Sequence, residues 1–380
     1  MKIRIPYLLT VFIAVLLLII GHRIATHGLS IFMDHSQEHA RATVTRIIDR
    51  IQPGDNLEPF DEYDDFFISM MGEQLIFEAE VRSGARRGQI ITAEQSLSEF
   101  LFNTPKEVEP GDNVLLINFD NDWFFNGYIR TGRLLGLGII FVLFILFFGG
   151  KKGFNTILSL GFTCAAVFAV FIPSILSGKN IYVMASLVCI YTTVMTLLIV
   201  MGYNKKSFAA VIGCISGIVI AGIITLIMDR VLHLTGIVDE HSRHLANLPI
   251  GTSINLKAII FGSIIIGAMG AVMDVAMSIA SSLWELKEKA ITIKFQALFR
   301  SGLNIGRDIM GSMANTLILA YIGSSLSVVI VLSVYSNSLM ELLNREMIIV
   351  EILQALAGSF GILFAIPLTA FFCATFYLKK

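Results

Sequence analysis

Charged side chains are scarce in this sequence. Only 15% of its 380 residues are Asp, Glu, Lys or Arg, whereas a soluble protein carries about a quarter. Hydrophobic residues make up 55%, and the mean hydropathy is +0.75. The formal net charge of −1 provides no field that would attract nucleic acid, so we expect no nucleic-acid partner. The composition indicates a protein whose solvent is the lipid bilayer.

Cysteine is also rare, and its placement excludes two classes of site. All four cysteines fall in apolar runs and none in the polar segment, so the sequence predicts no disulfide framework. No CxxC motif or Cys/His metal spacing is present, so we expect no metal site and no cofactor. A P-loop is absent too, so this chain alone is not expected to be an ATP-driven pump. The cysteines are Cys164, Cys189, Cys214 and Cys373.

Long apolar runs fill most of the chain. A helix needs roughly 20 mostly apolar residues to cross the bilayer core, and eight segments meet or approach this length. The first could instead be a cleaved signal peptide, but no clean cleavage site follows in residues 21–28, which favours an uncleaved anchor. The predicted spans are residues 5–21, 134–148, 157–176, 181–202, 208–228, 258–281, 313–335 and 357–378.

Lys and Arg in the short loops predict the orientation, because cytoplasmic loops carry an excess of them. With eight spans and a cytoplasmic N-terminus, every basic cluster lies on the cytoplasmic side. Arg130, Arg133, Arg230 and Arg243 are exceptions on the other side. We predict a multi-pass protein of the cell membrane, with both termini cytoplasmic and the lipid bilayer as a partner. The clusters are Lys2 and Arg4, Lys151 and Lys152, Lys205 and Lys206, Lys287 to Arg307, and Lys379 and Lys380.

The polar segment after the first span has the pattern of β structure. Phe77, Ala79 and Val81 alternate with charged residues, which is typical of a half-buried strand. Turn residues such as Gly84 and Gly111 separate this strand from its neighbours. Five short strands in this length predict a small barrel, of the oligonucleotide/oligosaccharide-binding type. The predicted strands are residues 42–51, 77–81, 89–93, 114–119 and 123–130.

These patterns together predict a mainly α fold with three parts. Residues 1–26 form a transmembrane anchor, residues 27–132 an extracytoplasmic β-barrel-like domain, and residues 133–380 a seven-span transmembrane bundle. The barrel is expected outside the membrane, where it could meet a membrane or extracellular protein partner.

One carboxylate interrupts the sixth predicted span. A charged side chain at the bilayer centre costs on the order of 2.5–3.5 kcal/mol on insertion scales, so such a residue defaults to a functional hypothesis. Asp274, Ser278 and Glu285 fall on one helical face. The alternative is that Asp274 lies among the inner headgroups and has no special role.

A second polar stripe precedes and enters the seventh predicted span. Asn304, Asp308 and Asn315 follow the same helical spacing, so two helices with one stripe each could line a shared path. Arg307 is a further candidate, or it pairs with Asp274 or Glu285 and locks the helices together. Three glycines in this stretch predict a discontinuous helix, as in transporter sites; they are Gly302, Gly306 and Gly311.

The strings GAMGAVMDVAMSIASS at residues 267–282 and SGLNIGRDIMGSMANTLILAYIGSSL at residues 301–326 resemble the YibE/F family of bacterial multi-pass membrane proteins. The resemblance covers roughly residues 127–378, and the preceding β domain fits that family's layout. It implies a membrane protein of Gram-positive or related bacteria, and it implies no substrate.

Three functions are compatible with these features. The first is a transporter or permease for a small solute or cation, with its site at Asp274, Ser278, Asn304, Arg307, Asp308 and Asn315. The second is a membrane-anchored interaction or assembly protein that uses the β domain, with the intramembrane polar residues structural. An intramembrane aspartyl protease built on Asp274 and Asp308 is a third, but the GxGD context is missing, so we do not expect an enzyme. A further cation candidate is the loop with Asp239, Glu240, His241 and His244.

Overall fold

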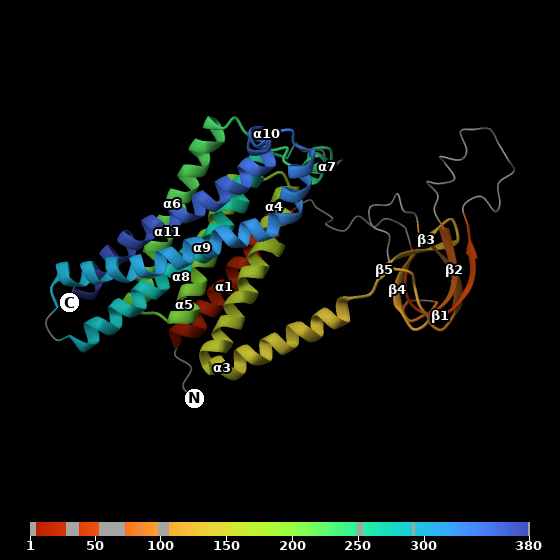
Figure 1. Cartoon of the computed structure of the whole chain (residues 1–380). Helices are drawn as coiled ribbons and strands as arrows, with labels where there is room; N and C mark the ends of the chain where they lie inside the picture. Colours follow the sequence, from red (N-terminus) through yellow and green to blue (C-terminus); the bar gives the residue numbers. More distant parts are fainter. Residues whose placement is uncertain are drawn as a thin grey trace. The chain divides into compact units, whose positions relative to one another are not determined.

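The computed structural model describes residues 5–27, 38–52, 73–84, 86–97, 106–248, 254–290 and 293–378. The chain forms two compact units (Figure 1). One unit contains the five strands and the first part of helix α3, up to Phe144. The other contains helix α1 and the chain from Ile145 onward.

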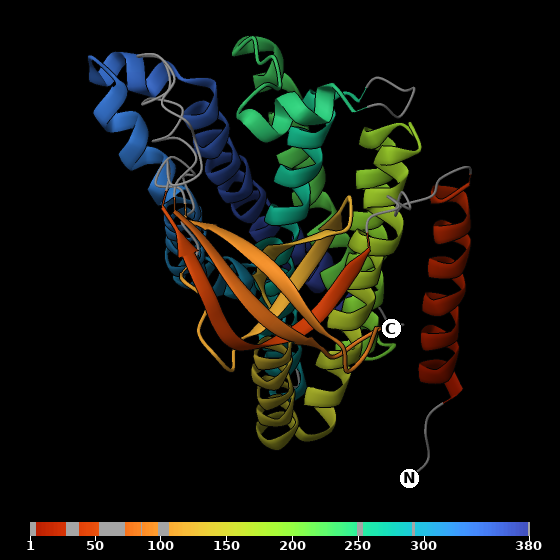
Figure 2. The ribbon, with the colours of Figure 1, turned by 90° about the vertical axis from the view of Figure 1, so that its right-hand side faces the viewer.

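The strands form a closed barrel in the order β1-β2-β3-β5-β4, which Figure 2 shows from its side. Strands β3 and β5 are parallel, and all other neighbours are antiparallel. The barrel and its five strands, as predicted, are confirmed. The strands are β1 (His39–Ile51), β2 (Glu73–Val81), β3 (Ile90–Leu97), β4 (Asn113–Phe119) and β5 (Asp122–Tyr128).

Alternation along β2 builds the barrel core. Leu75, Phe77, Ala79 and Val81 are fully buried, and the charged residues between them are half-buried. Successive side chains of a strand point to opposite faces, so the period-2 pattern in the sequence predicted this strand correctly. Trp123 of β5 closes the same core.

The remaining elements are helical. Within the described residues, seven helical runs are long and apolar enough to cross a membrane. The helices are α1 (Ile5–Ala25), α3 (Thr131–Ala165), the π-helix η1 (Ala166–Phe171), α4 (Ile172–Leu176), α5 (Ile181–Met201), α6 (Lys205–Val231), α7 (Glu240–Ala246), α8 (Leu256–Lys289), α9 (Phe295–Tyr335), α10 (Leu339–Asn344) and α11 (Glu346–Leu378).

The long run from Thr131 to Leu176 contains both the second and third predicted spans. Gly150 interrupts it with a φ of 52° and a ψ of −125°. The chain turns back there, as the position of Gly153 shows: a Cβ on this residue would meet the carbonyl oxygen of Ile145. Residues eight apart in a straight helix are about 12 Å apart. This reversal is compatible with two separate spans, and the count of eight stays a prediction.

Helix α9 differs from the prediction. Gly302, Gly306 and Gly311 lie inside one continuous helix; the expected discontinuity was wrong. A Cβ at Gly302 would lie 2.7 Å from the Cβ of Ala370 of α11. At Gly306 it would meet Ile366 of the same helix. These two glycines allow close packing of helices and do not break one.

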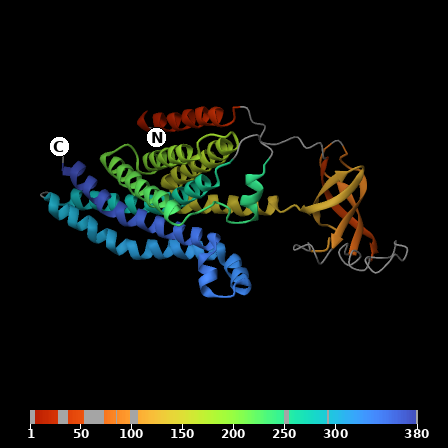
Figure 3. The ribbon, with the colours of Figure 1, turned by 90° about the horizontal axis from the view of Figure 1, so that it is seen from above.

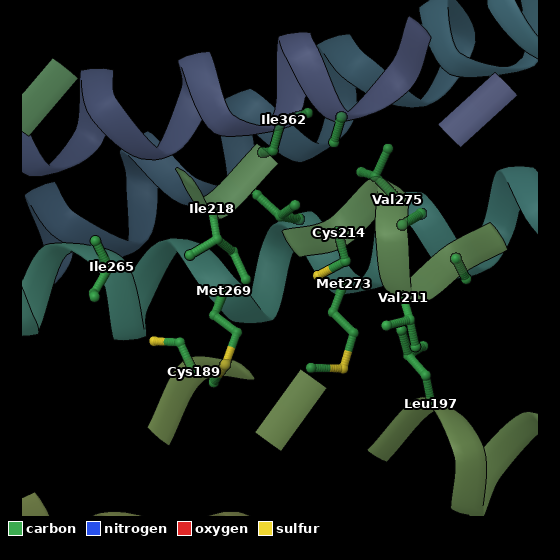
Figure 4. Packing of buried hydrophobic residues seen from close by; sticks show 14 of the residues in the cluster. Cys189, Leu197, Val211, Cys214, Ile218, Ile265, Met269, Met273, Val275 and Ile362 are labelled. Atoms are coloured by element: carbon green, nitrogen blue, oxygen red, sulfur yellow. The ribbon is translucent and has the colours of Figure 1, made fainter. Parts of the chain in front are cut away.

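Helices α5, α6, α8 and α11 surround the main hydrophobic core (Figure 4). Its side chains include the buried, free Cys189 and Cys214. Cys373 is buried as well, whereas Cys164 is exposed, so three of the four cysteines act as small apolar side chains in the interior. Helix α9 packs beside α11, at the edge of the helical unit in Figure 3.

Candidate functional site

Asp274 lies on α8, a helix that contacts α5, α6, α9 and α11. Its neighbours Val272, Met273, Val275 and Ala276 are buried in the core, whereas Asp274 is exposed. Asp274 makes no hydrogen bond or ion pair with any other residue that the structure describes. A central helix of the bundle therefore keeps one face open, and that face carries an unpaired carboxylate.

Helix α9 presents its polar stripe away from its packed face. Leu298, Gly302 and Gly306 are buried, whereas Asn304 and Asp308 are exposed. The reason is geometric, because a residue two positions further along a helix points roughly 200° away. Arg307 and Asn315 are exposed as well, and Ser278 of α8 is half-buried.

Helices α8 and α9 run antiparallel and meet at two levels. A Cβ at Gly302 would lie 2.9 Å from Cδ1 of Leu283, and one at Gly267 would lie 2.7 Å from Oη of Tyr321. These two contacts define which residues of α8 and α9 lie at the same height along the two helices.

Counting residues from these contacts brings the predicted site residues to shared levels. Asp274 is seven positions after Gly267, and Asn315 is six positions before Tyr321. At 1.5 Å per residue, Asp274 and Asn315 lie within about 2 Å in height. The same count places Ser278 level with Asp308. No hydrogen bond joins any of these four side chains within the described residues.

Space is open beside both stripes. A Cβ added at Gly270, one turn from Asp274, would meet nothing within 4 Å, and the same is true at Gly311, one turn from Asp308. The polar faces of the two helices are thus not filled by side chains of the helical unit at these positions.

Further polar groups were missed from the sequence. Tyr321 and Gln354 approach the backbone of Gly267, because a Cβ there would lie 3.3 Å from Nε2 of Gln354. Both side chains are half-buried, as is Glu351, one turn before Gln354 on α11. The polar spacing of Glu351 and Gln354 in an apolar helix was the available signal.

The helix lock predicted for Arg307 is not formed among the described residues. Glu285 instead pairs with Lys289, 2.9 Å away and one turn along the same helix. Arg307 has no ion-pair partner in the part of the chain that the structure describes.

The loop candidate for a cation has a structural explanation for one member. Asp239 caps α7: its Oδ1 accepts a hydrogen bond from the backbone N of Ser242 at 2.7 Å. Among the described residues, no group of three or more His, Cys, Asp or Glu side chains is placed to hold a metal ion.

A family model described as YibE/F-like protein matches residues 137–379. The match includes α8 and α9 with all the candidate residues, and the barrel lies outside it. No curated protein and no solved structure matches the chain. The match covers more than half of the sequence and agrees with the resemblance seen in residues 267–282 and 301–326, so the chain belongs to the YibE/F-like family.

Proposed function

We propose that this protein is a multi-pass transporter or permease for a small solute or ion. Its site is the pair of polar faces on α8 and α9. The carrying observation is Asp274, an exposed and unpaired carboxylate on a helix whose other faces are packed in the core. A lipid-facing anchor helix gains nothing from such a residue, whereas a path for a polar solute does.

The position of Asp274 along α8 supports a place within the hydrocarbon. The nearest charged residues of the helix are Lys257 and Glu285. At 1.5 Å per residue these lie about 25 Å and about 16 Å from Asp274 along the axis. A hydrocarbon core is about 30 Å thick. A helix bounded by Lys257 and Glu285 therefore carries Asp274 at membrane depth.

Polar groups at successive heights support a path. From one end to the other, α8 and α9 contribute Asp308 with Ser278, then Asn315 with Asp274, then Tyr321 near Gly267. Gln354 of α11 continues the series. Partners at intervals of a few ångströms suit a solute or ion that exchanges water for protein oxygens in steps.

The proposed mechanism is charge neutralisation at Asp274. A proton or a small cation that binds the carboxylate lowers the cost of this group in apolar surroundings. The neutral form is compatible with movement of the helix face through the membrane interior. Asn315 and Asp308, on the exposed face of α9, would offer the solute further polar partners along the path, and Arg307 and Asn304 would face the cytoplasmic entrance.

The orientation is part of the proposal: both termini are cytoplasmic, and the barrel is outside the cell membrane. Gln89 is an exposed residue of the barrel. In intact cells, an impermeant maleimide should label Gln89→Cys without permeabilisation. A cysteine in place of Lys205, in a predicted cytoplasmic loop, should react only after permeabilisation. The reverse labelling pattern would show the opposite topology and contradict the proposed orientation.

The test of transport uses the full chain in proteoliposomes. Proton flux is followed with pyranine inside the vesicles under imposed Na⁺, K⁺ or pH gradients. The wild type should exceed empty vesicles, and Asp274→Asn should reduce this flux at least tenfold. Glu285→Gln is the matched control, since it neutralises a carboxylate of the same helix that is already paired with Lys289. Equal flux in the wild type and Asp274→Asn would remove Asp274 from the mechanism.

A membrane-anchored assembly protein is the second candidate. The exposure of Asn304, Arg307 and Asp308 on α9 favours it, because exposed polar and charged side chains can contact a partner protein. On this reading, Arg307→Ala with Asp308→Ala should release a subunit or partner in native mass spectra and leave proton flux in proteoliposomes unchanged.

A further inference from the structure

The barrel unit contains a cavity of about 570 Å³ between its rim and the start of α3. Its basic lining comes from five separate places in the chain. Arg41 belongs to β1, Arg82 follows β2, Lys106 precedes β4, Arg130 follows β5, and Arg133 lies in the first turn of α3. The fold, and not one basic run of sequence, gathers these cations.

The cavity carries an excess of positive charge. Arg82 pairs with Glu80 at 2.9 Å, and Lys106 pairs with Glu109 at 2.8 Å. Arg41, Arg130 and Arg133 form no ion pair with any described residue. Three guanidinium groups around one cavity repel one another, and an anion between them would remove that repulsion.

The acidic and hydroxyl groups of the lining are already engaged. Asp112 accepts a hydrogen bond from the backbone N of Glu109 at 2.9 Å, which holds the turn before β4. Tyr128 donates to the carbonyl oxygen of Lys106 at 2.6 Å, and the guanidinium of Arg130 lies over its ring at 5.9 Å. The hydrogen bond to Glu109 raises the pKa of Lys106, so this ammonium stays charged at neutral pH. These contacts stabilise the rim, and the lining groups that have no ion-pair partner among the described residues are cations.

The ligand chemistry follows from the side chains. Guanidinium groups match the oxygens of phosphate in bidentate geometry and are preferred for its recognition. The volume suits a small headgroup rather than a single ion. A phosphate ester is thus the class of anion that fits this lining.

The position of the cavity in the chain identifies the source of the phosphate. Arg133 directly precedes Leu134, where an uncharged apolar run extends to Phe148. One residue of helix is about 1.5 Å, so the cavity lies where hydrocarbon gives way to headgroups if this part of α3 enters the bilayer. On the cytoplasmic side of membranes, basic pockets at the headgroup level bind anionic headgroups, and the same charge attraction acts at the outer surface.

We propose that the cavity binds the phosphate of an anionic phospholipid headgroup. It also accounts for Arg130 and Arg133, which are exceptions to the distribution of basic residues in the other loops. A bound headgroup would fix the start of α3 at the membrane surface. This proposal does not depend on transport, because all the residues that carry it belong to the barrel unit.

The test measures lipid binding by the full-length protein in detergent. Native mass spectrometry with added phosphatidylglycerol should show one tightly bound lipid, and phosphatidylcholine should bind at least tenfold more weakly at this site. Arg130→Gln with Arg133→Gln should weaken phosphatidylglycerol binding at least tenfold. Arg87→Gln is the matched control, since Arg87 is an exposed arginine of the same barrel that does not line the cavity. Equal binding by the double variant and the wild type would overturn the proposal.

Two further experiments address misfolding of the double variant and a soluble source of the phosphate. Binding to the unaltered protein should weaken steeply between 0.05 and roughly 0.5 M NaCl because screening weakens interactions of exposed charges; salt-independent binding contradicts the proposal. Inorganic phosphate and glycerol 1-phosphate at millimolar concentration should raise the melting temperature less than phosphatidylglycerol does. If inorganic phosphate raises the melting temperature as much as phosphatidylglycerol does, and the double variant loses this rise, the cavity binds a soluble anion. That result would overturn the proposal of a lipid ligand.

Discussion

The carbonyl oxygen of Gly361 on α11 lies 2.7 Å from the point that a Cβ at Gly217 on α6 would occupy. Val272 of α8 and Ala365 of α11 approach the same point at 2.8 and 2.9 Å. Three helices therefore meet at one glycine without space for a methyl group. Backbones approach this closely only where small residues face each other.

Gly217→Ala should destabilise the helical unit by about 1–3 kcal/mol, the usual range for overpacking a filled site. The measurement is the thermal or denaturant midpoint in detergent. Gly323→Ala is the matched control: it lies in α9 with nothing within 4 Å of the added Cβ. There the better helix propensity of alanine, worth up to about 1 kcal/mol, should leave stability equal or higher. Equal effects at the two glycines would contradict close packing at Gly217.

Tyr377 links the end of α11 to α8. It is 1% exposed, its hydroxyl donates to the carbonyl oxygen of Ala280 at 2.9 Å, and its ring meets Trp284 edge to face. Tyr377→Phe removes the hydrogen bond and should cost about 0.5–1.5 kcal/mol of unfolding free energy. Tyr377→Ala leaves a cavity and should cost about 3–5 kcal/mol. Tyr335→Phe, at a 75% exposed tyrosine, should change the midpoint little. A Tyr377→Phe midpoint equal to the wild type would show that this bond adds no stability.

Glu346 at the start of α11 holds the loop after α6. Its carboxylate accepts hydrogen bonds from the backbone N of Thr235 at 2.8 Å, the backbone N of Gly236 at 2.7 Å and the Thr235 hydroxyl at 2.7 Å. Glu346→Gln replaces one acceptor oxygen by a donor that faces donors, so it should cost roughly 1–3 kcal/mol. Amide hydrogen exchange in residues 234–238 should become faster. Glu240→Gln, at an exposed carboxylate on α7, should leave that exchange unchanged.

Stability of the barrel should depend on pH through Glu78. Arg46 of β1 donates two hydrogen bonds to this carboxylate, both 2.8 Å long, and thereby holds the pKa of Glu78 below its usual range. The contribution is therefore present above the unfolded pKa of glutamate and is lost as pH falls through the lowered folded value. The urea midpoint of the wild type should exceed that of Glu78→Gln at pH 7, and this difference should shrink as pH falls below the unfolded pKa of glutamate. The difference is expected to be small because the Arg46 side chain is exposed to solvent. If the difference between the two urea midpoints persists at acid pH, it comes from packing and not from the charge of Glu78.

The sequence by itself determined which segments are apolar helices and which are strands. Apolar runs of membrane length and the period-2 alternation around Phe77 each record burial along one element. Those patterns are local, because helix and strand geometry repeats every few residues. For the same reason, the shared faces of Asp274 with Ser278 and of Asp308 with Asn315 were readable from spacing alone.

Only the tertiary structure decided what lies beside each of these faces. It showed that Gly302 and Gly306 seat α9 against α11, whereas the sequence suggested a helix break. It set Asp274 level with Asn315, added Tyr321 and Gln354 to the series, and gathered Arg41, Arg130 and Arg133 around one cavity. The physical reason is that spacing fixes direction around one axis, whereas the neighbour across a helix or barrel depends on residues far away in the chain.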